Sequence, residues 1–362
     1  QGIEGESPWD YSGTSVSLAS DGNIIAIGAR ENDGNGSNNG HVRVFNWDGT
    51  SWSQIGQDID GEANPNQAGD QSGGAVSVNA AGDRVIIGAI YNDGNGSDAG
   101  HVRIYDWNGA VWIQLGQDID GDEVNGHSGN SVAINATGNI VAIGAPNVSN
   151  AKGSVKIYNW NGNSWSQIGQ NIYGEADSDY SGYSLTMNAS GERVAIGAYF
   201  NDGNGNASGH VRIYDWNGTT WIQVGQDIDG EASLDISGIS LSINDIGNRV
   251  VIGASQNNGN GNTSGHVRIY DWNGNLWVQI GQDVEGEAGG TPGDYFGEAV
   301  SVSSDGLSFI ASSPYNDQGG IDAGKVRVFG SPTTTICSQP LNITISETTY
   351  GTDFISSCDS IA

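Results

Sequence analysis

The sequence predicts an all-β protein, a six-bladed β-propeller built from four-stranded antiparallel blades. Three observations support this prediction. The chain has 58 glycines and an apolar share of only 36%, which is typical of many short strands joined by tight turns. One segment occurs six times, and a full copy contains four short runs with the alternation of β-strands.

The repeat is clearest in the segment Gly40-His41-Val42-Arg43-Val44-Phe45. Its second position returns as His101, Ser154, His210, His266 and Lys325, so the successive intervals are 60, 53, 56, 56 and 59 residues. Periods of this length, with four strands in each, are typical of propeller blades.

The second copy illustrates the four expected strands. Residues 73–79 alternate, a turn follows at 80–83, and residues 84–89 form a more apolar strand. Residues 101–107 and 111–115 are the third and fourth strands, joined by Asn108-Gly109, a dipeptide that accepts the positive φ angles of a type I′ turn.

The chain ends predict how the ring closes. The last copy stops at Gly330 without an outer strand, whereas Gln1-Gly2-Ile3-Glu4-Gly5-Glu6 matches residues 57–62 at the end of that strand. We therefore expect residues 1–5 to pair with residues 326–329, and residues 1–330 to form one propeller domain.

Residues 331–362 form a different segment, a linker or the start of a following module, with 13 Ser or Thr in 32 residues. Both cysteines of the chain, Cys337 and Cys358, lie here. We predict a disulfide between them, as suits an oxidising compartment, and two buried free thiols are the alternative.

The charge balance excludes some partners. Twelve basic residues against 42 acidic ones give a formal charge of −30, which repels nucleic acid and anionic lipid. No apolar run is long enough to span a membrane, and no signal segment begins the chain, so it reads as a mature or trimmed chain that does not insert directly into a membrane. The many Asn-x-Ser/Thr sequons favour a bacterial origin, because a eukaryotic secretory route would glycosylate them.

A family resemblance follows from three motifs. Tyr295-Phe296-Gly297, Gly144-Ala145-Pro146 and the Gly-x-Val-x-Ile/Val-Tyr/Phe strand resemble the phenylalanyl-glycyl/glycyl-alanyl-prolyl (FG-GAP) repeat of integrin α-subunit propellers and bacterial surface proteins. Five copies have Ser-Gly at the position of Phe296-Gly297: Ser12-Gly13, Ser72-Gly73, Ser128-Gly129, Ser181-Gly182 and Ser237-Gly238. The resemblance implies a secreted or cell-surface propeller, and the Asn-, Gly- and Ser-rich style is similar to adhesin-like proteins of marine Bacteroidota.

The chain departs from that family in two respects. Integrin propellers have seven blades, and the repeat here predicts six. The turns between the first two strands, such as residues 188–192 and 304–306, are too short for the family's Asp-x-Asp-x-Asp-Gly calcium loop.

The candidate binding residues lie in the loops between the second and third strands. We predict that Asp33, Asp93, Asp202 and Asp317 contact the partner, and that calcium, the one expected cofactor, binds at Asp33, Asp93 and Asp202. Oxygen-rich loops with glycine turns suit calcium, and they lie on the same face as the connections between blades. The alternative is that Asn, Asp and Gly are simply what tight turns require.

Three other sets of residues recur in the repeat. The tryptophan pairs around the last hairpin are interpreted as cross-strand packing, and sugar stacking is the alternative. His41, His101, His210 and His266 lie in different blades, so they are not expected to gather into one metal or catalytic site. The cations at positions 43, 103, 156, 212, 268 and 327 are expected to pair with acidic residues between blades.

No nucleophile–base set or phosphate-binding motif stands in a fitting context, so we do not expect an enzyme. The predicted function is a binding or adhesion module of a larger secreted or cell-surface protein, with a protein or glycan partner. The alternative is a structural spacer or self-assembly unit that binds copies of itself. A lyase or hydrolase at the central channel is the enzymatic option.

Overall fold

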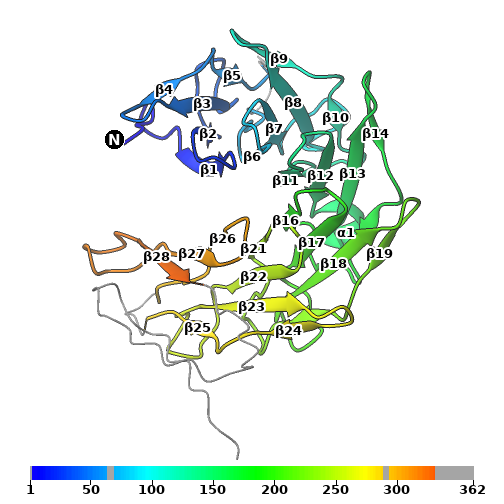
Figure 1. The fold of residues 1–362 in the computed structure, drawn as a ribbon, viewed down its shortest axis with the longest axis vertical. Coiled ribbons are helices and arrows are strands. Elements are labelled where there is room, and N and C mark those ends of the chain that lie inside the picture. The colour runs from blue at the N-terminus through cyan, green and yellow to red at the C-terminus, as the bar shows by residue number, and fades with distance from the viewer. Residues whose placement is uncertain (1, 63–68, 288–292, 331–362) are drawn as a thin grey trace, which may run out of the picture. The chain divides into compact units, whose positions relative to one another are not determined.

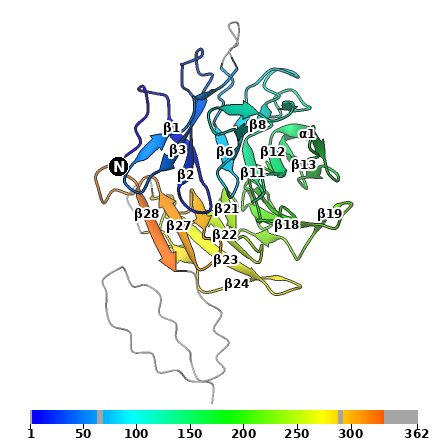
Figure 2. The same cartoon turned by 45° about the horizontal axis from the view of Figure 1, so that its top comes forward.

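The computed structural model describes residues 2–62, 69–287 and 293–330, and it confirms a six-bladed β-propeller. Each blade is an antiparallel sheet, and the sheets are arranged around a centre in chain order (Figure 1). The first strand of each blade is innermost, and β6, β11 and β21 face the centre in both views (Figure 2). Residues up to Pro332 form one compact unit.

Five blades have the same strand plan, in which a two-residue strand follows the fourth strand and pairs with the third. The first blade contains β1 (Ser12–Leu18), β2 (Ile24–Ala29), β3 (His41–Trp47), β4 (Trp52–Gln54) and β5 (Ile59–Asp60). The second contains β6 (Ala75–Val78), β7 (Arg84–Ala89), β8 (His101–Trp107), β9 (Trp112–Gln114) and β10 (Ile119–Asp120). The third contains β11 (Ser131–Ile134), β12 (Ile140–Ala145), β13 (Ser154–Trp160), β14 (Trp165–Gln167) and β15 (Ile172–Tyr173).

The remaining blades continue the series. The fourth contains β16 (Ser184–Met187), β17 (Arg193–Ala198), β18 (His210–Trp216), β19 (Trp221–Gln223) and β20 (Ile228–Asp229). The fifth contains β21 (Ser240–Ile243), β22 (Arg249–Ala254), β23 (His266–Trp272), β24 (Trp277–Gln279) and β25 (Val284–Glu285). The sixth contains β26 (Val300–Val302), β27 (Ser308–Ser313) and β28 (Lys325–Gly330).

The core lies between blades. In the second to fifth blades the second strand is covered on both faces by its neighbours, and strands buried on both sides read as continuous apolar runs. Thus Val85, Ile86 and Ile87 of β7 are all fully or almost fully buried. Val42 and Val44 of β3 pack with Val85 and Ile87 in one apolar cluster, which joins the first blade to the second.

The tryptophan pairs pack across their hairpins, as predicted, with ring centroids 5.3 or 5.4 Å apart. The second tryptophan of a pair also joins two blades. Trp221 is 3% exposed and donates its indole N–H to the carbonyl oxygen of Ile168, in the preceding blade, at 3.1 Å. The same bond recurs at Trp112, Trp165 and Trp277.

Ion pairs with acidic residues are present, as predicted, at positions 43, 103, 156, 212 and 268. Arg43, Arg103, Arg212 and Arg268 lie 3.6 to 3.9 Å from Glu6, Glu62, Glu175 and Glu231, and Lys156 pairs with Asp122. The sequence analysis missed a second set, in which Arg84, Arg193 and Arg249 bind Asp106, Asp215 and Asp271 through two parallel hydrogen bonds. Arg249 also donates to the carbonyl oxygen of Gly306 in the sixth blade, so these arginines too connect neighbours.

The predicted closure of the ring is wrong in its strand pairing. Residues 2–5 form no strand, and the described part of the sixth sheet contains three strands. The N-terminal residues match only positions 57–62, and they lack the Trp-x-Gln portion that pairs with the third strand elsewhere. Glu4 nevertheless accepts a hydrogen bond from Arg43 through its carbonyl oxygen, as Asp60 does from Arg103.

The β28 strand is poorly covered on the face that packs against the next blade elsewhere. Val326 is 62% exposed and Val328 is 75% exposed, whereas Val42 and Val44 at the same repeat positions are fully buried. Among the described residues the single helix is α1 (Val148–Ala151), one turn long, and no helix in this part of the chain could cross a membrane. Cys337 and Cys358 lie outside the described residues, so their disulfide stays a prediction.

Candidate functional site

One face of the propeller carries both the loops after each second strand and the connections between blades, and we call it the loop face. The connections bind these loops directly: Ser72 donates its backbone N–H to Asn39 O, and Ser128 donates to Ala99 O, both at 2.9 Å. Buried aspartates add a second anchor. Asp70, 2% exposed, accepts a hydrogen bond from the Asn92 amide at 2.8 Å, and burial raises the pKa of Asp70.

The four predicted partner-binding aspartates lie in these loops, each in a different blade. One carboxylate oxygen of each accepts the backbone N–H five residues later: Asp33 from Asn38, Asp93 from Asp98, Asp202 from Ala207 and Asp317 from Asp322, at 2.7 to 2.9 Å. In the fifth blade Asn258 makes the same bond to Thr263 at 2.8 Å. The turn therefore needs the side-chain oxygen and not the negative charge.

The structure does not bring these aspartates together. Within the described residues, none of them belongs to a group of three or more side chains that could ligate one metal ion. Calcium binding at Asp33, Asp93 and Asp202 therefore stays a prediction.

The sequence analysis missed a repeated strained position on the same face. The residue before each Ser-Gly or Phe-Gly pair has a left-handed backbone with φ between 51° and 55°, although it is never glycine or asparagine: Tyr11, Gln71, His127, Tyr180, Ile236 and Tyr295. Each begins a turn, in which its carbonyl oxygen accepts the N–H three residues later, and that turn leads into the innermost strand. Such strain in non-glycine residues is uncommon and clusters at functional sites.

Aromatic rings gather around this strained position. Tyr180 contacts Tyr199 and Phe200 at centroid distances of 5.7 and 5.6 Å, and Tyr183 contacts Tyr199 at 4.4 Å. In other blades, Tyr91 contacts His127, Tyr295 contacts Tyr315, and the Arg30 guanidinium lies over Tyr11. We call these residues the aromatic collar. Tyr11, Tyr183, Phe200 and Tyr315 of the collar are 37% to 49% exposed.

The collar residues at the strained position lead into the innermost strands, which face the centre of the ring (Figure 1). The Glu298 carboxylate of the sixth blade raises the pKa of Tyr183 in the fourth, and the Arg30 guanidinium of the first lowers it, both by less than burial does. Burial is the main cause that raises the pKa of Tyr183. The collar therefore combines exposed aromatic rings with the Arg30 guanidinium that lies over Tyr11.

The four histidines lie apart, one in each of four blades, as predicted, but each is grouped with acidic side chains that the sequence analysis did not connect to it. The groups are Glu6, His41 and Asp58; Glu62, His101 and Asp118; Glu175, His210 and Asp227; and Glu231, His266 and Asp283. Each histidine is 1% exposed. Burial, with a smaller contribution from the neighbouring arginine, lowers the pKa of His101, His210 and His266 to about 4, so these imidazoles are neutral at pH 7.

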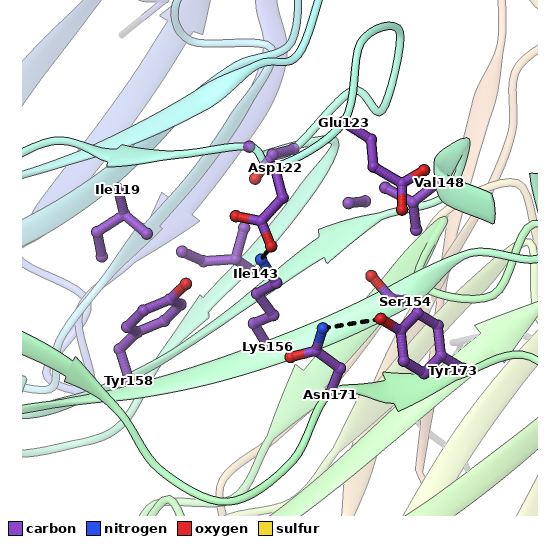
Figure 3. A pocket seen from close by; sticks show the side chains of 13 residues that line it. Ile119, Asp122, Glu123, Ile143, Val148, Ser154, Lys156, Tyr158, Asn171 and Tyr173 are labelled. Carbon is purple, nitrogen blue, oxygen red and sulfur yellow. Dashed lines mark hydrogen bonds and ion pairs between the residues drawn. The ribbon is translucent and has the colours of Figure 1, made fainter. Parts of the chain in front are cut away.

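The third copy lacks this histidine, and a small cavity lies there instead (Figure 3). Ser154 takes the histidine's position and Asn171 takes that of the aspartate. The Lys156 side chain points to the Asp122 carboxylate and pairs with it (Figure 3). The joint loss of histidine and aspartate in one copy was the sequence signal that could have linked the two positions.

Comparison with known proteins supports the fold alone. No family model and no curated protein matches the sequence. Among solved structures, the chain is similar to hydrazine synthase of Kuenenia stuttgartiensis, with a TM-score of 0.55 and 12% identity over 88% of this chain and 83% of the other. It is also similar to a Bacteroides uniformis protein assigned provisionally to the 6-phosphogluconolactonases, with a TM-score of 0.54 and 9% identity over 88% and 85% of the two chains.

Proposed function

We propose that this chain is a non-catalytic binding module of a secreted or cell-surface protein, which holds a protein or glycan partner on the loop face. The observation that carries the proposal is the aromatic collar, built on a strained backbone position that recurs in all six blades. Exposed aromatic rings supply large, rigid contact area, and binding residues concentrate on loops of a rigid scaffold. The FG-GAP-like motifs and the strongly acidic composition agree with an extracellular, adhesin-like role.

The collar predicts which variants lose the partner. Tyr183→Ala together with Phe200→Ala removes two exposed rings of the collar and should weaken binding at least about tenfold, the effect of losing a central aromatic contact. The measurement is binding of the purified chain to glycan arrays and to intact cells. Ile222→Ala, on an exposed residue of the outer strand β19, is the matched control and should bind like the original chain.

Two results would contradict this assignment. One is unchanged binding by the double variant; the other is a chain that binds only copies of itself in sedimentation velocity, which would favour the self-assembly alternative. Turnover of a substrate by the original chain would instead support the enzymatic option.

Calcium is expected to bind at the loop face and to stabilise the folded chain. Asp93→Asn with Asp202→Asn removes two charges but keeps the turn bond, as Asn258 shows. We expect millimolar calcium to raise the melting temperature of the original chain, an increase that the double variant reduces, because few carboxylates in each loop imply weak affinity. Thermal melts with calcium and with chelator measure it. An equal response in both proteins would mean that these aspartates serve the turns alone.

A further inference from the structure

The histidine groups between blades have the chemistry of a metal site that is separate from the loop face. Each combines one imidazole with a glutamate from the preceding blade, or from the N-terminal segment in the first, and an aspartate from its own blade. Nitrogen and carboxylate donors together suit zinc and related transition ions, whereas calcium prefers oxygen alone.

The group around His266 is the best formed. The His266 Nδ1 atom lies 3.8 Å from Glu231 Oε2 and 4.0 Å from Asp283 Oδ2, too far for hydrogen bonds. Zinc lies about 2.0–2.1 Å from nitrogen and oxygen ligands, so two ligands of one zinc ion can be up to about 4.2 Å apart. Both separations fall within that limit.

The buried imidazole has no other partner in the structure. Neither ring nitrogen of His266 makes a hydrogen bond, although the residue is 1% exposed, and the Nε2 atom of His210 also lacks one. A buried polar nitrogen without a partner is costly. The Nδ1 atom of His266 faces the two carboxylates, and a metal ion between them would satisfy it.

Local charge also favours a cation. Glu231, Asp283 and Glu285, the cross-strand neighbour of His266, bring three carboxylates, and one oxygen of Glu285 is buried without a hydrogen bond. The nearby positive group is Arg268, 3.9 Å from Glu231. With the carboxylates ionised, the net charge around the imidazole is negative even after Arg268 is counted.

The two copies without histidine provide an internal comparison. In the third, Lys156 pairs with Asp122, and in the sixth, Lys325 takes the histidine position and its Nζ lies 2.5 Å from Glu287. In both, a lysine ammonium meets the acidic residue that elsewhere belongs to the histidine group. Lys325 thus places a cation where the imidazole lies in other copies, whereas Lys156 occupies the repeat position of Arg43, which contacts Glu6 in the same way.

We propose that the four Glu–His–Asp groups bind divalent transition-metal ions of the zinc type, one ion in each group. Each ion would link the blade that carries the histidine to the segment that precedes that blade. The group of Glu231, His266 and Asp283 is the reference site. The ions act on the scaffold, so this proposal is independent of the partner-binding function.

The test is a zinc titration of the chelator-treated full chain by calorimetry, with cobalt as a spectroscopic substitute. We expect four equivalents of zinc, and His266→Ser, which copies the natural residue Ser154, should reduce the number to three. Asn171→Ala, in the copy that lacks histidine, is the matched control and should leave four. Cobalt should give visible absorption that decreases by a quarter in His266→Ser.

Near-ultraviolet circular dichroism shows whether each variant is folded, and Asp283→Asn, which copies Asn171, replaces His266→Ser if the latter misfolds. The loop-face variant Asp93→Asn/Asp202→Asn should still bind four zinc ions, which separates this site from the calcium prediction. A folded original chain that binds no zinc, or equal binding by the original chain and the folded site variant, would overturn the proposal.

Discussion

Gly88→Ala is expected to destabilise the propeller by at least about 3 kcal/mol, or to prevent folding, because the added methyl group has no space. An ideal Cβ at Gly88 would lie 2.0 Å from the carbonyl oxygen of Gly129 and 2.9 Å from its carbonyl carbon, both backbone atoms of the next blade. Backbone cannot rotate away as a flexible side chain can, so the two blades would have to separate.

The same approach occurs at four other blade junctions. A Cβ at Gly28, Gly144, Gly197 or Gly253 would lie 2.0 to 2.2 Å from a carbonyl oxygen of the adjoining blade. Gly109→Ala is the control, because this hairpin glycine has φ of +93° but no atom within 4 Å of the added carbon. The Gly109→Ala variant should lose only about 1–2 kcal/mol of stability, which is the cost of an alanine in the left-handed conformation. Urea unfolding of both variants measures the difference, and equal losses would refute the steric explanation.

These glycines explain in physical terms why the motifs predicted the fold. Gly88 occupies the glycine position of the Gly-Ala-Pro element, and Gly129 follows serine in the next copy at the Phe-Gly position. The repeat places the two elements far apart along the chain, and the propeller brings their backbones into contact. Five copies with the first glycine, and a sixth with Ser312 in its place, were therefore enough to predict the blades and their number.

The closure could not be predicted as well, because similarity at residues 1–6 says nothing about whether a strand can form there. Only the end of the outer strand is present in that segment, and the contacts that survive are those of Glu4 and Glu6 with Arg43. The match of residues 1–6 to residues 57–62 indicated where this segment lies relative to the blades. It wrongly predicted hydrogen-bonded pairing of the segment with β28.

The candidate sites, like the fold, could be predicted from the sequence only in part. The loops with Asp33 and Asp93 could be placed on one face, because turn residues and strand order fix where loops emerge. The strained residue before each Ser-Gly pair has no common identity across the six copies, so only backbone angles revealed it. The acidic partners of His266 come from the preceding blade and from a later strand, and a contact of that kind depends on the packing of blades.

The tryptophan pairs predict the second large effect. Within the hairpin their packing could be read from the sequence, but the contact of Trp221 with the preceding blade could not. Its backbone N–H donates to the Gln170 side-chain oxygen at 3.1 Å, and the Gln170 amide donates to Trp221 O at 2.7 Å. Its ring lies over Gly169, where an added Cβ would be 2.8 Å from the indole. The tryptophan of one copy thus contacts the Gly-Gln pair, Gly169 and Gln170, that ends the same strand in the preceding copy.

Trp221→Ala is therefore expected to lower the free energy of unfolding by about 3–5 kcal/mol, since it removes a large buried ring and leaves a cavity between the third and fourth blades. Trp221→Phe keeps part of the volume but leaves Ile168 O without its indole donor, and should cost about 1–3 kcal/mol. Trp52→Ala, at the same repeat position in the first blade but only partly buried, should cost less than Trp221→Ala. Chemical denaturation of the three variants gives the ranking. If Trp52→Ala is as harmful as Trp221→Ala, the greater burial of Trp221 does not add to the stabilising role of these tryptophans.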